Sequence, residues 1–120
     1  MVIYNQMVVD LTEARADRIF HALADTTRRD IVLRTLDSEY SVSALARQYP
    51  MSFAAVQKHI AVLEGAELVT KERRGREQIV RSNVDTIRTA NRLLEQWEEI
   101  WRGRIDRIGA LLAEDRGETR

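Results

Sequence analysis

The polar side chains of one short stretch could recognise a hydrogen-bonding partner. The stretch SFAAVQKHIAVLE, residues 52–64, carries Gln57, Lys58 and His59 side by side. An amide offers donors and an acceptor, an ammonium group offers three donors, and an imidazole offers one or two. Such groups suit the base edges and phosphates of a nucleic acid, and they equally suit the solvated face of an ordinary helix. The neighbouring elements must decide between these two interpretations.

Apolar residues in the same stretch predict a helix with one buried stripe. With about 100° of rotation per residue, four of them fall on one side of the helix. They are Phe53, Val56, Ile60 and Leu63. Lys58 lies opposite this stripe, and Gln57 and His59 lie on its flanks. Ser52 can cap the helix, so we expect the stripe to pack in the core while the polar side chains face outward. For Phe53 the stripe favours a core position over the alternative, an exposed position that faces a ligand.

Two helices are predicted ahead of this stretch. Asp10 and Glu13 have the spacing of a capping box and predict a helix over about 11–24. Asp25 or Thr26 can cap a second helix. Apolar residues recur at helical spacing in both segments, which supports the two assignments.

A short third helix and a tight turn complete a helix-turn-helix pattern. Ser41 or Ser43 can cap the third helix. Pro50 forbids its continuation, because the residue before a proline is pushed out of the α region. Residues 49–52 then lead into the helix of 52–64, and this succession is typical of a helix-turn-helix.

The segment LVTKERRGREQIVRS, residues 68–82, changes to a two-residue alternation that predicts a β-hairpin. Arg74-Gly75 stands at its centre, where a tight turn favours a residue that tolerates positive φ. Residues 71–81 hold five cations and two anions, although the whole chain has a formal net charge of zero. We therefore expect Arg73, Arg74 and Arg76 to contact phosphates rather than merely keep a hairpin soluble.

A long helix is predicted from Asn83 onward. Ile87, Leu94, Trp101 and Ile108 fall on a seven-residue repeat, and Trp97 lies on the neighbouring stripe. Such a seam needs a partner, so it predicts a homodimer; a ligand pocket around the tryptophans is the alternative. The residues predicted to form the dimer interface are Phe20, Ile87, Leu94, Trp97, Trp101 and Ile108. Gly103 interrupts the seam and leaves open whether the helix is continuous.

Together these elements predict a mainly α protein with a small β-hairpin, in the order α-α-α-α-β-β-α. This is the order of a dimeric winged helix-turn-helix protein. We expect a single domain over 1–115, with the first and last helices forming the dimer interface. We expect a disordered tail over 116–120.

Three segments resemble the ArsR/SmtB family of bacterial transcriptional regulators, in the order that this family uses. They are FHALADTTRRDIVLRTL, YSVSALARQYPMSFAAVQKHIAVLEGAELV and RRGREQIVR. The resemblance implies a cytoplasmic, homodimeric protein that binds double-stranded DNA through the helix of 52–64. One departure is Glu67, which stands where the family commonly has glycine, and we expect the turn to use Gly65 instead.

The resemblance also bears on metals and cofactors. Metal-sensing members have a Cys-x-Cys pair where this chain has Ser41-Val42-Ser43, and serine hydroxyls are poor ligands for soft metals. The predicted last helix contains no histidine for the other usual metal site. The segment WEEIWRGRIDRIGALL is similar to the tail of a metal-independent subgroup. We therefore expect no metal site and no cofactor.

The resemblance assigns a role to each polar residue of the predicted recognition helix. Gln57 would pair with adenine, and Lys58 with guanine or a phosphate. Ser52 would direct the helix amides at a phosphate, and Ala54 would approach a thymine methyl group. His59 would donate to a phosphate, and a boundary histidine with its partners inside the protein is the alternative. The residues predicted to bind DNA are Ser52, Ala54, Gln57, Lys58, His59, Arg73, Arg74 and Arg76.

The sequence thus favours a repressor that occupies a promoter as a homodimer on an inverted repeat. A winged-helix module that binds another protein, with incidental DNA binding, is the alternative, and the zero net charge is its best argument. A third hypothesis adds an unknown small-molecule effector between the first and last helices. No catalytic constellation and no export or membrane-spanning segment is recognised in the sequence, so we expect neither an enzyme nor a membrane partner.

Overall fold

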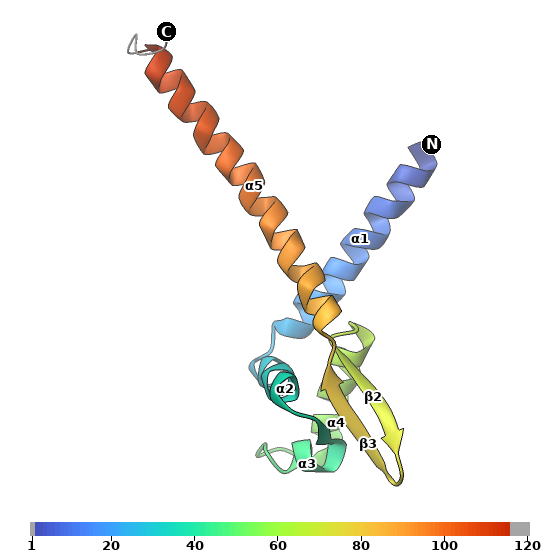
Figure 1. Ribbon diagram of the computed structural model, residues 1–120. Helices are drawn as coiled ribbons and strands as arrows, with labels where there is room; N and C mark the ends of the chain where they lie inside the picture. The colour runs from blue at the N-terminus through green and yellow to red at the C-terminus, as the bar shows by residue number, and fades with distance from the viewer. Residues whose placement is uncertain (1, 116–120) are drawn as a thin grey trace. The chain divides into compact units, whose positions relative to one another are not determined.

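The computed structural model describes the backbone of residues 2–115 and the side chains of residues 13–115. In chain order its elements are α1 (Val2–Leu23), α2 (Thr26–Asp37), β1 (Tyr40–Ser41), α3 (Val42–Ala46), α4 (Phe53–Gly65), β2 (Val69–Arg74), β3 (Glu77–Ser82) and α5 (Val84–Asp115) (Figure 1). This order confirms the predicted winged helix-turn-helix fold. The predicted tail over 116–120 lies outside the described residues.

The chain divides into two compact units, one that ends at Arg88 and one that begins at Thr89. The first unit contains the helix-turn-helix and the hairpin. The second consists of the greater part of α5. The single domain over 1–115 stays a prediction.

Side-chain caps begin the helices of the first unit. Asp25 Oδ2 accepts a hydrogen bond from the backbone N–H of Arg28 at 3.0 Å and caps α2. Ser41 Oγ accepts from Ala44 at 3.0 Å and caps α3. These two caps decide between the alternatives that the sequence left open.

The prediction for the start of the first helix was wrong. Helix α1 begins at Val2 and runs through Asp10, so the capping-box spacing of Asp10 and Glu13 does not mark its start. That spacing is a local signal, and it cannot stop a helix when the preceding residues, which include neither glycine nor proline, also favour one.

A three-stranded antiparallel sheet forms in the order β1-β3-β2. The predicted hairpin is β2 and β3, which pair from Val69 opposite Ser82 to Arg74 opposite Glu77, and Gly75 in the turn has φ +65°. Strand β1 was not predicted. It is two residues long, pairs with Ile79 and Val80 of β3, and is too short to show an alternating pattern.

The core of the first unit collects apolar side chains from the helices α1 to α4 and from the strands β2 and β3. The fully buried ones include Ile19, Ile31, Leu45, Val56, Ile60, Leu63, Leu68, Val69 and Val80. A polar link fixes α2 to the sheet, because the hydroxyls of Thr35 and Ser82 lie 2.8 Å apart and Ser82 also donates to the carbonyl of Val32 at 2.8 Å.

Two predictions around α4 were wrong. Phe53 is 48% exposed rather than buried, because it is the first residue of the helix and lies beyond the packed part of the stripe. The turn after α4 uses Glu67, with φ +61°, rather than Gly65, which stays helical. The N–H of Leu68 bonds the carbonyl of Leu63 at 2.9 Å, and this closure requires a left-handed residue just before Leu68.

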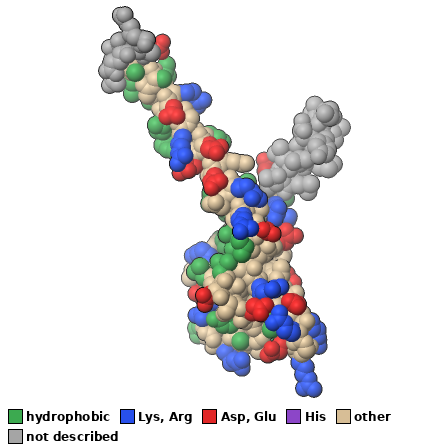
Figure 2. Space-filling view, viewed as in Figure 1, with side chains coloured by type: hydrophobic (Ala, Val, Ile, Leu, Met, Phe, Trp, Pro, Cys, Tyr) green, Lys and Arg blue, Asp and Glu red, His purple; other side chains and the backbone are tan. Residues whose placement is uncertain are grey.

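Helix α5 runs without a break from Val84 to Asp115, so Gly103 neither ends nor splits it. Large apolar side chains are exposed along the helix in the second unit: Leu94, Trp97, Ile100, Trp101, Ile105, Ile108, Leu111 and Leu112. Figure 2 shows green hydrophobic side chains along this helix. None of the helices in residues 2–115 has the length and apolar composition needed to cross a membrane.

Candidate nucleic-acid interface

Helix α4 is held by its inner face and offers its outer face to a partner. Val56, Ile60 and Leu63 are fully buried against the rest of the first unit. Ser52 Oγ accepts a hydrogen bond from the backbone N–H of Ala55 at 3.1 Å, which confirms it as the cap of α4. Burial and capping together fix the direction in which the outer side chains project.

The outer face of α4 contains four of the residues predicted to bind DNA. Ser52, Ala54, Gln57 and Lys58 are all exposed. Within residues 13–115, the side chains of Gln57 and Lys58 make no hydrogen bond or ion pair with another side chain. Their donors and acceptors are therefore available to a ligand.

His59 belongs to a different surrounding. Its side chain is half-buried, with Nδ1 3.3 Å from Nη1 of Arg28 and 3.8 Å from Oδ2 of Asp25. A hydrogen bond from the Arg28 backbone lowers the pKa of Asp25, and the charges of His59 and Arg28 add to this effect. The phosphate contact of His59 stays a prediction, but this side chain already contacts the start of α2.

Arg28 and Arg29 direct their side chains to the end of α1. Nε of Arg28 donates to the carbonyl of Ala22 at 2.7 Å, and Nη1 of Arg29 donates to that of Leu23 at 2.7 Å. Both arginines therefore cap the end of α1, where the last carbonyls of a helix lack partners.

The hairpin presents two different faces. In an antiparallel pair, opposite residues share a face and the faces alternate along each strand. Glu72 and Arg74 therefore lie on one face, and Lys71 and Arg73 lie on the other, opposite Val80 and Gln78. The charges of the hairpin are thus divided between a face with its own carboxylates and a face without them.

Arg74 is engaged in an ion-pair network on the first of these faces. Its Nη1 lies 3.1 Å from Glu39 Oε1, its Nη2 lies 3.4 Å from Glu72 Oε2, and Arg81 joins the same two carboxylates at 3.4 Å. The hydrogen bonds from Arg74 lower the pKa of Glu39. Figure 2 shows acidic and basic side chains interspersed over the hairpin. Among the described residues, Arg73 and Arg76 have no ion pair.

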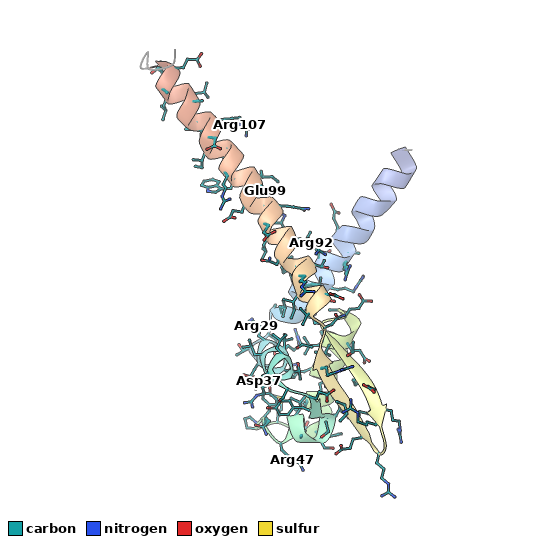
Figure 3. The ribbon with its side chains drawn as sticks, in the orientation of Figure 1. Arg29, Asp37, Arg47, Arg92, Glu99 and Arg107 are labelled. Atoms are coloured by element: carbon teal, nitrogen blue, oxygen red, sulfur yellow. The ribbon has the colours of Figure 1, made fainter. Side chains whose placement is uncertain are left out.

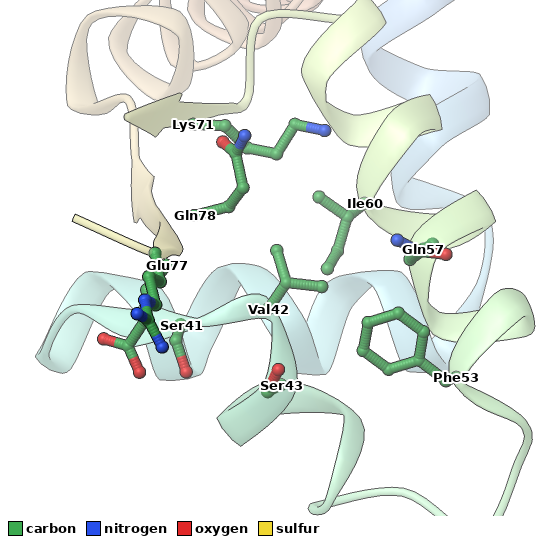
Figure 4. Close-up of a pocket in the computed structure, with 10 residues that line it drawn as sticks. Ser41, Val42, Ser43, Phe53, Gln57, Ile60, Lys71, Glu77 and Gln78 are labelled. Carbon is green, nitrogen blue, oxygen red and sulfur yellow. The ribbon is translucent and has the colours of Figure 1, made fainter. Parts of the chain in front are cut away.

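A cleft of about 330 Å³ separates α4 from the hairpin (Figure 4). Its lining residues are Ser41, Val42, Ser43, Phe53, Gln57, Ile60, Lys71, Arg76, Glu77 and Gln78. The cleft brings Gln57 and Arg76 together, as the sequence had suggested for one binding surface. Sequence reasoning missed Phe53 and Gln78 as members, although the alternation of β3 places Gln78 on the face of Arg73.

Residues predicted to form the dimer interface lie on α1 and α5. Phe20 and Ile87 are half-buried, whereas Leu94, Trp97, Trp101 and Ile108 are exposed.

Over the described residues, no group of three or more histidine, aspartate or glutamate side chains is arranged to hold a metal ion. Ser41 and Ser43, which stand at the positions of the Cys-x-Cys pair of metal-sensing members, line the cleft between α4 and the hairpin.

The first unit combines a helix-turn-helix, a basic hairpin beside it and a free polar face on α4. This combination defines a winged helix-turn-helix protein of the DNA-binding type. No family model matches the chain. The chain is 34% identical over 91 residues to the uncharacterized HTH-type transcriptional regulator YuzN of Bacillus subtilis, and the match covers 69% of this chain and 95% of that protein. A match of 53 residues to the HTH-type transcriptional regulator Rv2034 of Mycobacterium tuberculosis is 49% identical and covers 44% of this chain and 50% of that protein.

Similar solved structures identify the family of this chain. An ArsR-like transcriptional regulator from Rhodococcus sp. RHA1 is 31% identical, with a TM-score of 0.76, and the match covers 83% of this chain and 94% of that one. The homodimeric winged helix-turn-helix DNA-binding domain of Mb0332 from Mycobacterium bovis is 22% identical, with a TM-score of 0.59 and coverage of 82% and 89%. The chain belongs to the ArsR family of transcriptional regulators.

Proposed function

We propose that this regulator is a homodimeric repressor that binds an inverted-repeat operator through α4 and blocks transcription by occupying the promoter. The observation that carries the proposal is the free outer face of α4. Gln57 and Lys58 are exposed and have no side-chain partner within residues 13–115, while the opposite face of the helix is fully buried. A rigidly held helix with free hydrogen-bonding groups suits the major groove of DNA.

Each outer residue of α4 has a specific role in this proposal. Gln57 pairs with adenine through its amide, and Lys58 donates to guanine or to a phosphate. Ala54 is small enough for close approach and contacts a thymine methyl group. Ser52 caps the helix and aims its first amides at a phosphate. Each base contact contributes on the order of 1–3 kcal/mol of discrimination between base pairs.

The hairpin supplies phosphate contacts in the proposed complex, and its arginines are not equivalent. Arg73 and Arg76 have no ion pair among the described residues, so they can bind phosphate without losing one. Arg74 is already held by Glu39 and Glu72 and acts as a positioning residue that fixes the hairpin. His59 likewise positions α4 through Arg28.

The exposed apolar stripe of α5 supports the proposed homodimer, and the Mb0332 domain gives an example of a homodimer with this fold. A two-fold axis would place two copies of α4 about one DNA turn apart, roughly 34 Å, so the two half-sites are inverted. The absence of cysteine in the chain, with Ser41 and Ser43 in the cleft, supports control that does not depend on a soft metal. An organic effector between α1 and α5 stays a prediction.

Binding to the DNA upstream of the chain's own gene tests the proposal. We expect tight binding to one fragment in a mobility-shift series, and at least about tenfold weaker binding for the Gln57→Ala/Lys58→Ala variant. The matched control is Arg92→Ala/Gln96→Ala, which likewise removes one basic residue and one glutamine, but from α5, and should bind as the wild type does. Weak binding that salt erases and that ignores sequence would instead indicate the protein-interaction module.

A further inference from the structure

The cleft between α4 and the hairpin has an apolar part that the phosphates of DNA cannot use. Val42 and Ile60 line it with buried side chains, and beside them the ring of Phe53 is 48% exposed. Figure 4 shows Phe53 and Ile60 of α4 directed toward Val42 of α3. Charged oxygens gain nothing from such a surface, whereas a second aromatic ring would pack well against Phe53.

Two free amides lie beside this apolar part. Gln57 of α4 and Gln78 of β3 both line the cleft, and within residues 13–115 neither side-chain amide has a hydrogen-bond partner. Ser41 is different, because its Oγ already accepts from the backbone N–H of Ala44 at 3.0 Å. An apolar surface with a few convergent polar groups is the usual composition of a small-molecule site.

The charges that line the cleft favour an anion. Arg76 has no ion pair among the described residues, so its guanidinium can hold a carboxylate by two parallel hydrogen bonds. Lys71 lies 3.5 Å from Glu64 and is partly neutralised by it. Glu77, the acidic lining residue, stands opposite Arg74 in the strand pairing, and this arginine offsets its charge.

We propose that the cleft binds a small aromatic carboxylate and that this ligand excludes operator DNA from α4. The aromatic ring packs on Phe53 against Val42, and the carboxylate pairs with Arg76. Gln57 and Gln78 bind polar substituents of the ring. The volume of the cleft, about 330 Å³, lies within the range of small-molecule sites.

Gln57 links the ligand to DNA binding. Its amide lines the cleft and is also the group assigned to an adenine in the proposed operator complex. It cannot bind both partners at once, so a ligand that engages Gln57 and Arg76 prevents two DNA contacts directly. The ligand therefore favours the DNA-free protein without any change of fold. This regulatory part of the inference rests on the proposed function of α4, whereas the binding site itself does not.

Direct binding tests the site, with 2-naphthoate as the probe and the full chain labelled with ¹⁵N. In the absence of DNA, naphthoate should shift the amide resonances of Phe53, Gln57 and Gln78 in a saturable manner. The uncharged 2-naphthamide has the same rings but cannot form an ion pair with Arg76, so it should bind at least about tenfold more weakly. Unshifted resonances at these residues in millimolar naphthoate, or shifts confined to α5, would overturn the proposal.

Two variants with matched controls test the ligand contacts. Arg76→Ala should abolish the preference for naphthoate over naphthamide. Arg47→Ala should keep it, because Arg47 lies at the end of α3 and outside the lining of the cleft (Figure 3). Phe53→Ala should weaken the binding of both compounds about tenfold, whereas Leu33→Ala, which removes an exposed side chain of α2, should not. Naphthoate binding that survives Arg76→Ala and Phe53→Ala unchanged would contradict the assigned site.

Competition at constant ionic strength tests the regulatory part. The apparent dissociation constant for the operator fragment should rise in proportion to the naphthoate concentration, and Phe53→Ala should reduce this rise about tenfold. Naphthoate that binds in the cleft but leaves operator binding unchanged would overturn the exclusion of DNA. A chain that binds naphthoate but no DNA fragment would instead refute the proposed function, and with it the exclusion, while the binding site would stand.

Discussion

Helices α4 and α5 carry apolar stripes of the same kind, but only α4 buries its stripe within its own unit. Ile60 of α4 is 1% exposed, whereas Leu94 and Trp101 of α5 are 48% and 57% exposed. An apolar stripe in a sequence shows that a partner surface exists, without showing which chain provides it. The difference in burial shows that the stripe of α4 packs inside its own unit, whereas the stripe of α5 is free to contact a partner.

The polar sides of the two helices differ in whether their side chains have partners. Gln57 and Lys58 on α4 have no side-chain partner within residues 13–115, whereas charged residues of α5 form pairs such as Glu98 with Arg102. A helix that packs by its apolar side and leaves unsatisfied groups on its polar side is suited to a polar ligand. A helix that pairs its polar groups and exposes its apolar stripe is suited to pack against another apolar helix.

The largest expected effect is on the free energy of unfolding, which should respond differently to the loss of an apolar side chain from α4 and from α5. Ile60→Ala should lower the free energy of unfolding by about 2–5 kcal/mol, because it leaves a cavity in the core. The matched control, Ile100→Ala on α5, removes a side chain that is 71% exposed and should cost less than about 0.5 kcal/mol. Urea denaturation measures both, and equal losses would contradict the contrast between the helices.

The next effect concerns assembly. Leu94→Asp/Trp101→Asp should raise the dissociation constant of the dimer at least about 100-fold, because carboxylates would be buried in an apolar interface. Leu33→Asp, which changes an exposed residue of α2, is the control. Sedimentation at micromolar concentration is the measurement. A double variant that remains dimeric would show that α5 is not the seam.

A smaller effect distinguishes the free cations from the paired one. Arg73→Ala/Arg76→Ala should weaken binding to all DNA sequences alike and reduce the salt slope of the affinity by about four for the bound dimer, that is, by about two for each protomer. Arg74→Ala should change the slope by less than about one, because this arginine is neutralised by Glu39 and Glu72. Affinity measured over a range of salt concentrations compares them. A larger slope change for Arg74→Ala would assign it a direct phosphate contact.

The smallest effect concerns the turn that places α4. The carboxylate of Asp30 accepts hydrogen bonds from the Tyr49 hydroxyl at 2.6 Å and from Nε of Arg34 at 2.7 Å, which lower its pKa below the ordinary value of 3.8. Its contribution to stability is therefore present above pH 3.8 and is lost as the pH falls through the lowered pKa.

Asp30→Asn should consequently cost less than about 1 kcal/mol at pH 7, since the group is partly exposed and screened. The difference from the wild type should vanish towards pH 2. Thermal unfolding as a function of pH checks this, with Asp37→Asn at the end of α2 as the control. A difference that persists unchanged in strong acid would contradict the assigned role of the carboxylate.

Local patterns predicted much of the first unit correctly. Asp25, Ser41 and Ser52 cap helices, and the alternation around Gly75 forms the hairpin, because caps and turns depend on a few neighbouring residues. The start of α1 was missed because a capping pattern does not exclude a helix that is already in progress.

Features that depend on distant residues could not be predicted from the sequence. Strand β1 exists because β3 pairs with it, and Arg28 turns to the end of α1 because unsatisfied carbonyls lie there. Glu67 adopts positive φ where the N–H of Leu68 bonds the carbonyl of Leu63 at the end of α4. The pairing of Arg74 with Glu39 likewise joins residues that are far apart in the chain.

Selection of bound sequences from a random duplex library tests the central claim most directly. The wild-type chain should enrich two half-sites in inverted orientation, about one DNA turn apart. Gln57→Ala should lose the preference at one base pair in each half-site, at symmetry-related positions, and keep the others. An unenriched library, or a motif that the Gln57→Ala and Lys58→Ala variants leave unchanged, would contradict the assignment of α4 as the helix that binds the bases.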